Sequence, residues 1–375
     1  IMIIAGEAFG DLHGAGLAAS LKRFIPGVHF FGIGGEAMRS EGVETVYDVG
    51  ETAVMGISEV IRRYGFLKKI YREMVALARE RRPDAVVLVD YPGFNLRFAA
   101  EAHRMGIKTI YYVCPQVWAW NRRRIPVMAR TVDLLVSIFP FEKEHFEGED
   151  LRVEYAGHPL ADEARRAQSE SVSELDWDGG HRLVLLPGSR PHEIERIFPV
   201  IWRAAGLLEK DLPGLSVRTA CSSAGAEESV RKCLDSLKGG PSNHGIVTGA
   251  TRQALRRADA GIIASGTATI EASLMECPMV IVYRVSWLTY LLGRMVVKVD
   301  NIGMVNIIAG REICPELVQG SAKPGAIAGA VKPMLTDTPG RRSVVEALRR
   351  VNSALDEGDA YGKAAEKIAE VLCCG

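Results

Sequence analysis

The chain has 375 residues, of which 47% are hydrophobic and 25% are charged, so it is long enough for two soluble domains with separate cores. Its 46 basic and 46 acidic residues cancel, which argues against a general affinity for nucleic acids or acidic partners. The seven cysteines are scattered, odd in number and without a Cys-x-x-Cys pair, a pattern typical of reduced thiols in the cytoplasm.

Short apolar runs alternate with helix-length segments in the first half of the chain. Strands that are buried on both faces read as continuous apolar runs, so this alternation predicts a parallel sheet covered by helices. The predicted strands are residues 2–5, 29–33, 85–89, 109–113 and 134–139.

The alternation restarts after a polar stretch, QSESVSELDWDGG, at residues 168–180. We interpret this stretch as a linker between a first Rossmann-like domain at 1–168 and a second at 169–340. Residues 341–375 are amphipathic and predict closing helices. The expected fold class is therefore α/β, with two parallel sheets. The predicted strands of the second domain are residues 182–187, 215–220, 260–265 and 279–284.

No apolar run reaches 18 residues, so we expect no transmembrane helix, and we find no signal peptide in the sequence. Residues 61–82 form a basic amphipathic segment, in which eight Lys or Arg residues are interleaved with aromatic and aliphatic side chains. Such a segment suits an anionic membrane surface, although a solvated helix with an apolar face on the core has the same pattern. The residues expected to face the membrane are Arg62, Arg63, Phe66, Lys68, Lys69 and Arg72.

Two strands of the second half lead into turns that suit a phosphate group. Gly188, Ser189 and Arg190 follow the first of them and precede a helix, which offers an anion both backbone N–H groups and a guanidinium. A surface turn with a solvated arginine is the alternative, but two such turns in one domain predict a nucleotide site. The second turn consists of Ser265, Gly266, Thr267 and Ala268.

Four polar residues that follow these turns in the sequence are further candidates for the site. Glu271 lies on the first turn of the helix that follows, where it can accept hydrogen bonds from ribose hydroxyls or complement the helix dipole. Asn306 precedes a helix-like run and suits either the ligand or a helix cap. Glu316 and Gln319 lie about one turn apart and are expected to face the same cleft.

In the first half of the chain, acidic residues follow two of the predicted strands. The opening turn, GEAFGD, carries Glu7 and Asp11, where a pyrophosphate would need free backbone N–H groups. The strand at 85–89 ends on Asp90, and Asn95 follows at the start of a helix. Because ligands of parallel α/β sheets bind beyond the carboxyl ends of strands, Asp90 is a candidate general base. A structural acid at a strand end is the alternative.

Several familiar motifs are absent or misplaced. The sequence contains no GxxxxGK[ST], HExxH or GxSxG, so P-loop, zincin and serine-hydrolase chemistry lack support. Asp176 and Asp178 form a DxD triplet, but this triplet precedes a strand, so we do not expect a metal site there. His158 is interpreted as a hydrogen-bonded structural histidine.

Taken in order, the motifs of the chain resemble those of the lipid-A-disaccharide synthase family. The resemblance spans roughly residues 5–320, and the ordered set is highly specific. The segments that carry it include GEAFGDLHGA (6–15), FFGIGGEAM (30–38), VDYPGFN (89–95), YYVCPQVWAW (111–120), LLPGSR (185–190) and ASGTATIE (264–271).

The resemblance implies a GT-B glycosyltransferase, with two Rossmann-like domains facing across a cleft and C-terminal helices crossing back to the first domain. It implies that the diacylglucosamine unit of UDP-2,3-diacylglucosamine moves onto 2,3-diacylglucosamine 1-phosphate, giving lipid A disaccharide 1-phosphate and UDP. The family works without a metal ion or other cofactor as a peripheral protein at the cytoplasmic face of the inner membrane. A homodimer is implied by the resemblance alone.

The resemblance also implies roles for the candidate residues. Arg190, Asn306 and the turn at 265–268 would neutralise the leaving diphosphate, and Glu271 would hold the ribose. Asp90 is the first candidate for the base that takes the proton from the acceptor 6-hydroxyl. Glu7 is the second candidate, as the base or as a residue that orients the acceptor. Asp11, Asn95, Glu316 and Gln319 are expected to line the acceptor side or other parts of the cleft.

The chain departs from the family pattern at two positions. Phe9 stands where the family usually has serine, which argues against a role for a hydroxyl group there. Gly93 stands where relatives often have an acid, which favours Asp90 as the functional carboxylate of its turn. Two alternatives stay open: another GT-B enzyme, such as a UDP-GlcNAc epimerase or a MurG-like transferase, and a sugar-nucleotide or lipid binder without activity.

Overall fold

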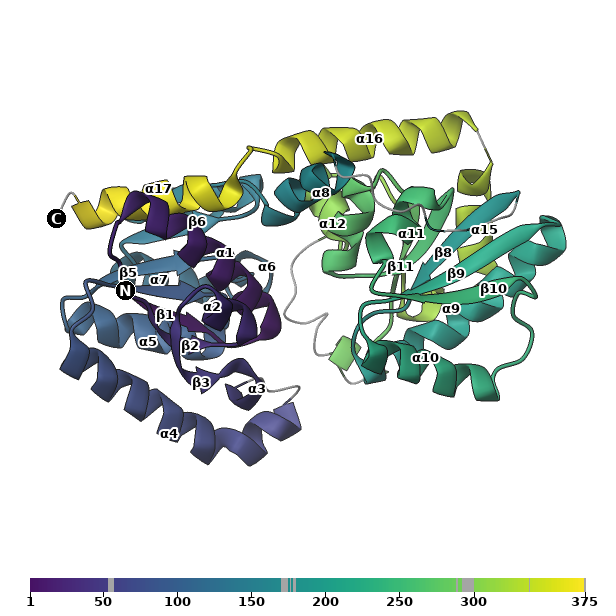
Figure 1. Cartoon of the computed structure of the whole chain (residues 1–375). Coiled ribbons are helices and arrows are strands. Elements are labelled where there is room, and N and C mark those ends of the chain that lie inside the picture. The colour runs from purple at the N-terminus through teal and green to yellow at the C-terminus, as the bar shows by residue number, and fades with distance from the viewer. Residues whose placement is uncertain are drawn as a thin grey trace. The chain divides into compact units, whose positions relative to one another are not determined.

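The computed structural model describes two compact units, shown in Figure 1. One unit comprises Ile1–Pro159 together with Leu355–Gly375, and the other comprises Leu160–Ala354. The predicted linker lies mostly outside the described residues, as do Asp176 and Asp178. The backbone alone is described at 57–63 and 167–169, and the described residues are 1–52, 57–169, 175, 177, 180–287, 289–291, 300–336 and 338–373.

The first unit contains a parallel sheet of seven strands in the order β3-β2-β1-β4-β5-β6-β7. The inner strands β1, β2, β4 and β6 are buried along their whole length, as their apolar sequences predict. The strands are β1 (Met2–Ala5), β2 (Phe31–Gly34), β3 (Glu44–Asp48), β4 (Ala85–Val89), β5 (Lys108–Tyr112), β6 (Leu134–Ser137) and β7 (Arg152–Tyr155).

The C-terminal helix α17 completes the first unit by packing against α1, as Figure 1 shows. His13 on α1 and Tyr361 on α17 join the two helices through a hydrogen bond of 2.9 Å. The helices of this unit are α1 (Ala8–Phe24), α2 (Glu36–Ser40), α3 (Val49–Thr52), α4 (Ile57–Arg81), α5 (Pro92–Arg104), α6 (Val117–Trp120), η1 (Arg122–Arg124), α7 (Ile125–Thr131), η2 (Pro140–Phe146) and α17 (Ala360–Cys373).

The second unit contains a parallel sheet of six strands in the order β10-β9-β8-β11-β12-β13. Apolar side chains from its inner strands pack with those of α9 and α15 into a continuous core. The strands are β8 (His181–Leu186), β9 (Leu215–Cys221), β10 (His244–Thr248), β11 (Ala260–Ala264), β12 (Met279–Tyr283) and β13 (Glu316–Val318).

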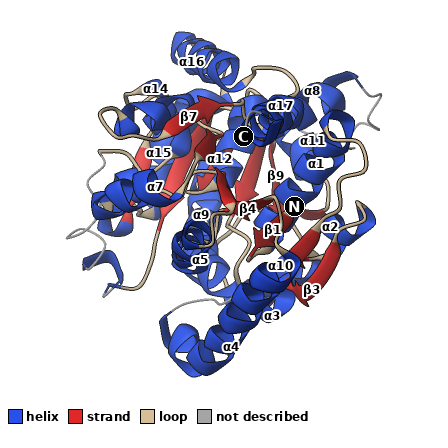
Figure 2. Ribbon diagram, turned by 90° about the vertical axis from the view of Figure 1, so that its left-hand side faces the viewer, coloured by secondary structure: helices blue, strands red, loops and turns tan. Residues whose placement is uncertain are grey.

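Helices flank the strands of both sheets, as Figure 2 shows, so the predicted α/β class with two parallel sheets is confirmed. From Leu160 onward α8 belongs to the second unit, as does nearly all of α16. The second unit's helices are α8 (Pro159–Ser169), α9 (Pro191–Asp211), α10 (Ala224–Ser236), α11 (Thr251–Arg257), α12 (Thr267–Leu274), α14 (Met304–Ala309), η3 (Gln319–Ser321), α15 (Pro324–Leu335) and α16 (Pro339–Leu355).

Each sheet has one point at which the strand order reverses. In the first sheet this point lies between β1 and β4, and in the second it lies between β8 and β11. Loops that leave the two strands at such a point run to opposite faces of the sheet and leave a crevice at its carboxyl edge, where α/β proteins bind ligands. The fold therefore directs attention to the turns after these four strands.

Among the helices of the described part of the chain, none combines the length and the hydropathy that crossing a membrane requires.

Candidate active site

A pocket of about 300 Å³ lies at the reversal point of the second sheet. The turns after β8 and β11 form its wall, and Glu193, Ser222 and Thr251 contribute further polar groups. Thr251 opens α11, and Ser222 directly follows β9, so the rule that ligands lie beyond strand ends also locates Ser222. The predicted residues that line the pocket are Gly188, Ser189, Arg190, Ser265, Gly266, Thr267, Ala268 and Glu271.

The turn after β8 presents donors to this pocket. Gly188 has φ +109°, in the left-handed region that favours glycine, and the turn leads into the 21-residue helix α9. Ser189 donates its backbone N–H to Glu193 at 3.3 Å. Arg190 caps α9 and is exposed, and no acid of the described chain lies within ion-pairing distance of its guanidinium. The helix dipole and the guanidinium together favour an anion here.

The turn after β11 is fixed from a neighbouring segment. Ser265 donates its hydroxyl to the carbonyl of Ile302 at 3.1 Å, and Gly266 is the N-cap residue of α12. Thr269 donates its hydroxyl back to the carbonyl of Gly266 at 2.8 Å. The first residues of α12 line the pocket, so the backbone N–H groups at the start of this helix are available to a ligand there. This helix follows β11, and α9 follows the neighbouring strand β8.

The carboxylate of Glu271 is oriented by an arginine that the sequence did not single out. Arg252 Nε lies 3.6 Å from Glu271, and the same guanidinium forms an ion pair with Glu163. Burial raises the pKa of Glu271, Arg252 opposes this shift, and the charge of Glu163 adds to it. Arg252 lies on α11 and reaches Glu271 only through tertiary packing, so its spacing in the sequence carried no signal.

Asn306, Glu316 and Gln319 make internal hydrogen bonds in the second unit. Asn306 is fully buried and donates its side-chain amide to Glu316 at 2.7 Å and to the carbonyl of Cys314 at 2.8 Å. The side chain of Gln319 accepts the backbone N–H of Val285 at 2.9 Å and donates its amide N–H to the carbonyl of Val285 at 2.8 Å. None of the three is among the residues that line the 300 Å³ pocket, so their roles towards a ligand stay predictions.

In the first unit, Asp90 occupies a sharp turn directly after β4. Asp90 and Tyr91 have φ +47° and +49°, left-handed values that are uncommon for residues other than glycine. The carbonyl of Asp90 accepts the hydroxyl of Tyr111 at 2.5 Å and the side-chain amide of Asn95 at 2.8 Å. Strain that is held in this way at a strand end is typical of functional sites.

Asp90 and Glu7 lie on the two turns at the reversal point of the first sheet, and their charges interact. Burial, and then the charge of Glu7, raises the pKa of Asp90 to about 6. Glu7 is exposed at the N-cap of α1. A carboxyl group with such a pKa is ionised at neutral pH and is a stronger base than an ordinary aspartate, which suits a general base.

Gly6, which opens GEAFGD, allows the turns after β1 and β4 to pack closely against each other. A Cβ atom on Gly6 would lie 2.2 Å from the ring of Tyr91, so only glycine admits this ring. Tyr91 also donates its hydroxyl to the carbonyl of Thr52 at 3.2 Å. The ring thereby fixes the turn after β4 against the turn after β1, beside Asp90.

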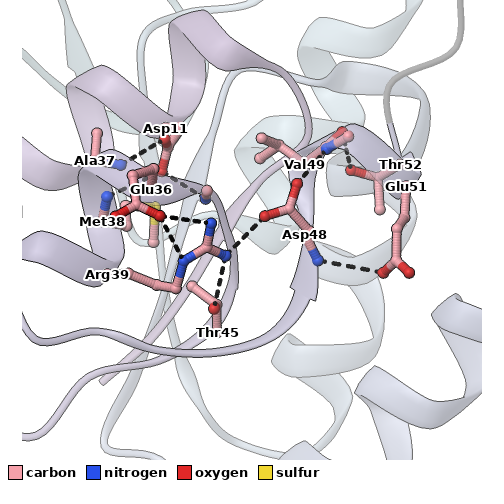
Figure 3. Close-up of polar contacts among 12 residues, drawn as sticks. Asp11, Glu36, Ala37, Met38, Arg39, Thr45, Asp48, Val49, Glu51 and Thr52 are labelled. Atoms are coloured by element: carbon pink, nitrogen blue, oxygen red, sulfur yellow. Dashed lines mark hydrogen bonds and ion pairs between the residues drawn. The ribbon is translucent and has the colours of Figure 1, made fainter.

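Asp11 and Asn95, the remaining candidates of this unit, are buried and bind backbone groups. Figure 3 shows the carboxylate of Asp11 at the start of α2, where it accepts N–H groups of Ala37 at 3.0 Å and Met38 at 3.1 Å. Asn95 donates to the carbonyls of Val89 at 3.2 Å and of Asp90. These hydrogen bonds fix the backbone on both sides of the crevice. Any contact of Asp11 or Asn95 with a ligand stays a prediction.

The basic segment predicted to face a membrane lies on α4. Lys68, Lys69 and Arg72 are exposed, and the side chain of Phe66 is 38% exposed. Lys69 lies 3.7 Å from Glu73, four residues further along the helix. The side chains of Arg62 and Arg63, also predicted to face the membrane, lie outside the described residues.

Two further observations concern metal ligands and a buried histidine among the described residues. No group of three or more His, Cys, Asp or Glu side chains in the described ranges is arranged to hold a metal ion. His158 is buried, its backbone N–H donates to the carbonyl of Leu355 at 3.0 Å, and burial lowers its pKa to about 3. The imidazole is therefore neutral at physiological pH.

Comparison with known proteins agrees with this arrangement. A glycosyltransferase of kitacinnamycin has a TM-score of 0.66 at 16% identity, covering 99% of this chain and 98% of that one. A UDP-GlcNAc 2-epimerase from Methanocaldococcus jannaschii, in complex with UDP-GlcNAc and UDP, has a TM-score of 0.60 at 12% identity, covering 100% and 99%. These identities establish the shared fold alone, which is the predicted GT-B fold.

The sequence comparisons are more specific. The family model described as lipid-A-disaccharide synthetase matches residues 1–368. A lipid-A-disaccharide synthase of Geobacter metallireducens is 39% identical over 377 residues, which cover 99% of this chain and 97% of the relative. The chain therefore belongs to the lipid-A-disaccharide synthase family.

Proposed function

We propose that the chain is an inverting hexosyltransferase that moves the 2,3-diacylglucosamine unit of UDP-2,3-diacylglucosamine onto 2,3-diacylglucosamine 1-phosphate. The products are lipid A disaccharide 1-phosphate and UDP. Family membership over nearly the whole chain supports this assignment. The observation that carries it is the presence of one reversal-point site in each sheet, a phosphate-compatible pocket in one unit and a raised-pKa aspartate in the other.

The pocket of the second unit is the proposed UDP site. Negative charge develops on the diphosphate as the sugar leaves, and Arg190 together with the N-termini of α9 and α12 stabilises that charge. Glu271, oriented by Arg252, accepts hydrogen bonds from the ribose hydroxyls. The positive charge needed at the leaving group is thus supplied by residues of the chain.

Asp90 is the proposed general base in the first unit. Its carboxylate takes the proton from the acceptor 6-hydroxyl while the hydroxyl oxygen attacks the anomeric carbon of the donor. The bond from that carbon to the diphosphate oxygen breaks on the opposite side, so UDP leaves with the bonding electrons and the configuration inverts. Glu7 keeps the pKa of Asp90 high and accepts a hydrogen bond from another acceptor hydroxyl.

Release of UDP that depends on the acceptor tests this proposal. The purified chain is incubated with the donor alone and with donor and acceptor together, and free UDP is measured. We expect rapid release only when both are present. Equal release in the two reactions would indicate a hydrolase, and conversion of the donor sugar to an epimer would indicate the alternative enzyme class.

Peripheral association with an anionic membrane is part of the proposal, because both substrates carry acyl chains. The exposed Lys68, Lys69 and Arg72 on α4, with Phe66 among them, support this contact. Co-sedimentation with anionic vesicles should weaken as salt rises, since exposed charges are screened. Binding that does not respond to salt would contradict the electrostatic part. A homodimer rests on the family resemblance, and sedimentation of the purified chain tests it.

A further inference from the structure

A second cavity, of about 670 Å³, lies in the first unit between α4 and α5. This volume falls within the range of small-molecule sites, and it exceeds the voids that well-packed interiors leave. The sequence did not predict the cavity, and of the residues that line it only Lys68 has a role in the function proposed above. The residues that line it are Tyr64, Leu67, Lys68, Tyr71, Tyr91, Gly93, Phe94, Arg97, Ala100 and Arg104.

The wall of the cavity is aromatic and rigid. The rings of Tyr71 and Phe94 meet edge to face at 5.5 Å, and those of Tyr91 and Phe94 stack at 5.7 Å. The hydroxyl of Tyr71 already has a partner, because it donates to the carbonyl of Arg97 at 3.2 Å. An apolar occupant can therefore pack against ring faces without leaving this hydroxyl unpaired.

Two cations lie at the opening of the cavity. Lys68 and Arg97 are both exposed and both line it. Neither has an acidic partner within ion-pairing distance in the part of the chain that the structure describes, whereas Arg104 is paired with Glu101 at 2.7 Å. An apolar interior with unpaired cations at its opening is complementary to an anionic amphiphile, with an acyl chain inside and a phosphate outside.

The position of the cavity identifies which amphiphile it fits. Tyr91 and Gly93 line it, and both belong to the turn that holds Asp90. The cavity therefore adjoins the turn that carries the candidate base, since Tyr91 directly follows Asp90 in the chain. A membrane phospholipid has no reason to lie there, whereas an acylated sugar with its reacting hydroxyl at Asp90 does.

We propose that this cavity binds an acyl chain of the acceptor, with Lys68 and Arg97 facing the acceptor's phosphate. The proposal rests on the proposed transferase function and adds the structural basis of acceptor selection. Gly93 lies beside open space, since a Cβ atom at this position would meet no atom within 4 Å. Acceptor recognition in this chain is then governed by the packing of α4 against α5.

Filling the cavity provides the test. Ala100 is half-buried in the wall, and Ala100→Phe places a ring inside the cavity. Ala76→Phe is the matched control, because Ala76 is exposed on α4 and does not line the cavity. We expect Ala100→Phe to raise KM for the long-chain acceptor about tenfold or more, since several CH₂ groups of its acyl chain are no longer buried in the cavity. KM for the donor and for an acceptor with acetyl groups should change little, and Ala76→Phe should resemble the unaltered chain.

The outcomes separate this inference from the proposed function. If the unaltered chain forms no disaccharide, the proposed function fails whatever the variants do. If it does, equal effects of Ala100→Phe on long-chain and acetyl acceptors, or no effect, would overturn the cavity assignment. Loss of vesicle binding with unchanged KM in detergent would assign the cavity to a bilayer lipid instead. UDP binding and the thermal unfolding temperature of Ala100→Phe check that the variant folds.

A charge variant gives a second, independent readout. Arg97→Gln should raise KM for the phosphorylated acceptor and leave KM for the dephosphorylated acceptor unchanged, because a guanidinium binds phosphate through charge-assisted hydrogen bonds. Arg130→Gln is the control, since Arg130 is exposed on α7, does not line the cavity and has no role in the proposed binding or catalysis. A loss that is equal for both acceptors would contradict a phosphate contact at Arg97.

Discussion

Burial, and then the charge of Glu7, raises the pKa of Asp90, although Glu7 and Asp90 are far apart in the sequence. The two charges interact because β1 and β4 are adjacent parallel strands at the reversal point of the sheet, so the turns that follow them share one edge. The ring of Tyr91, which fits only over a glycine at position 6, holds these turns together. The opening glycine motif thus places the charge of Glu7 where it acts on Asp90.

Replacing Asp90 by Asn should remove the general base and keep the fold. Asparagine tolerates the left-handed backbone of this position, and the carbonyl contacts to Tyr111 and Asn95 do not involve the side chain of Asp90. We expect kcat to fall roughly 10²- to 10⁴-fold, as for loss of a general base. UDP affinity, measured by calorimetry, should be unchanged. Near-normal turnover would refute the assignment.

The pH profile should report the pKa of Asp90. The carboxylate is the active form, so kcat/KM should decline below about pH 6, where the carboxyl group becomes protonated. Glu7→Gln removes the negative charge that raises this pKa and should shift the acidic limb to lower pH. An acidic limb that does not move would show that Glu7 does not act through Asp90. Glu7→Asp, which keeps the charge, is the control.

Arg190→Ala should weaken binding of UDP. A charge-assisted contact between a guanidinium and the diphosphate contributes roughly 1.5–3 kcal/mol, which is about a tenfold or larger change in Kd. Arg196→Ala on the same helix is the control, because Arg196 is exposed and does not line the pocket. Equal UDP affinity of the two variants would place the diphosphate elsewhere.

Discrimination between ribose and deoxyribose should depend on Glu271 and Arg252. Glu271→Gln removes the charged acceptor for the ribose hydroxyls, and Arg252→Gln removes the group that orients it. Both variants should reduce the preference for UDP over 2′-deoxy-UDP, which competition binding measures. A purely structural role of Arg252 would weaken both nucleotides equally and leave their ratio unchanged.

Glu142 should make the stability of the first unit depend on pH. Burial raises the pKa of this carboxyl group to about 8, and Oε1 accepts the indole N–H of Trp118 at 3.3 Å. Between about pH 4.5 and pH 8 the folded state holds a proton that the unfolded state releases, so stability falls as pH rises, by at most about 1.4 kcal/mol per pH unit. Glu142→Gln should abolish this slope in thermal unfolding. An identical slope in the variant would show that Glu142 is ionised in the fold.

The sequence predicted the inner strands better than the edges of the sheets. Buried strands such as β4 and β11 are continuous apolar runs, and they were located almost to the residue. The edge strands β3, β10 and β13 were not predicted, because they are only half-buried and their side chains mix polar with apolar. β7, the other edge of the first sheet, is not among the predicted strands either.

Prediction of the site followed the same logic. Residues that directly follow buried strands, such as Ser265 and Asp90, could be found because strand ends define the ligand edge of a parallel sheet. Arg252 and the 670 Å³ cavity could not, since both depend on helices that pack together from distant parts of the chain. Asn306 was singled out because it precedes a helix-like run, whereas its full burial among backbone groups of its own unit depends on tertiary structure.

The most direct test of the proposed transfer reaction is to identify its product. The purified chain is incubated with UDP-2,3-diacylglucosamine and 2,3-diacylglucosamine 1-phosphate, and the lipid fraction is analysed by mass spectrometry and NMR. We expect a β-1,6-linked tetra-acyl disaccharide 1-phosphate with one UDP per disaccharide, and loss of both in Asp90→Asn. UDP release without a disaccharide, or a disaccharide with the α configuration, would contradict it.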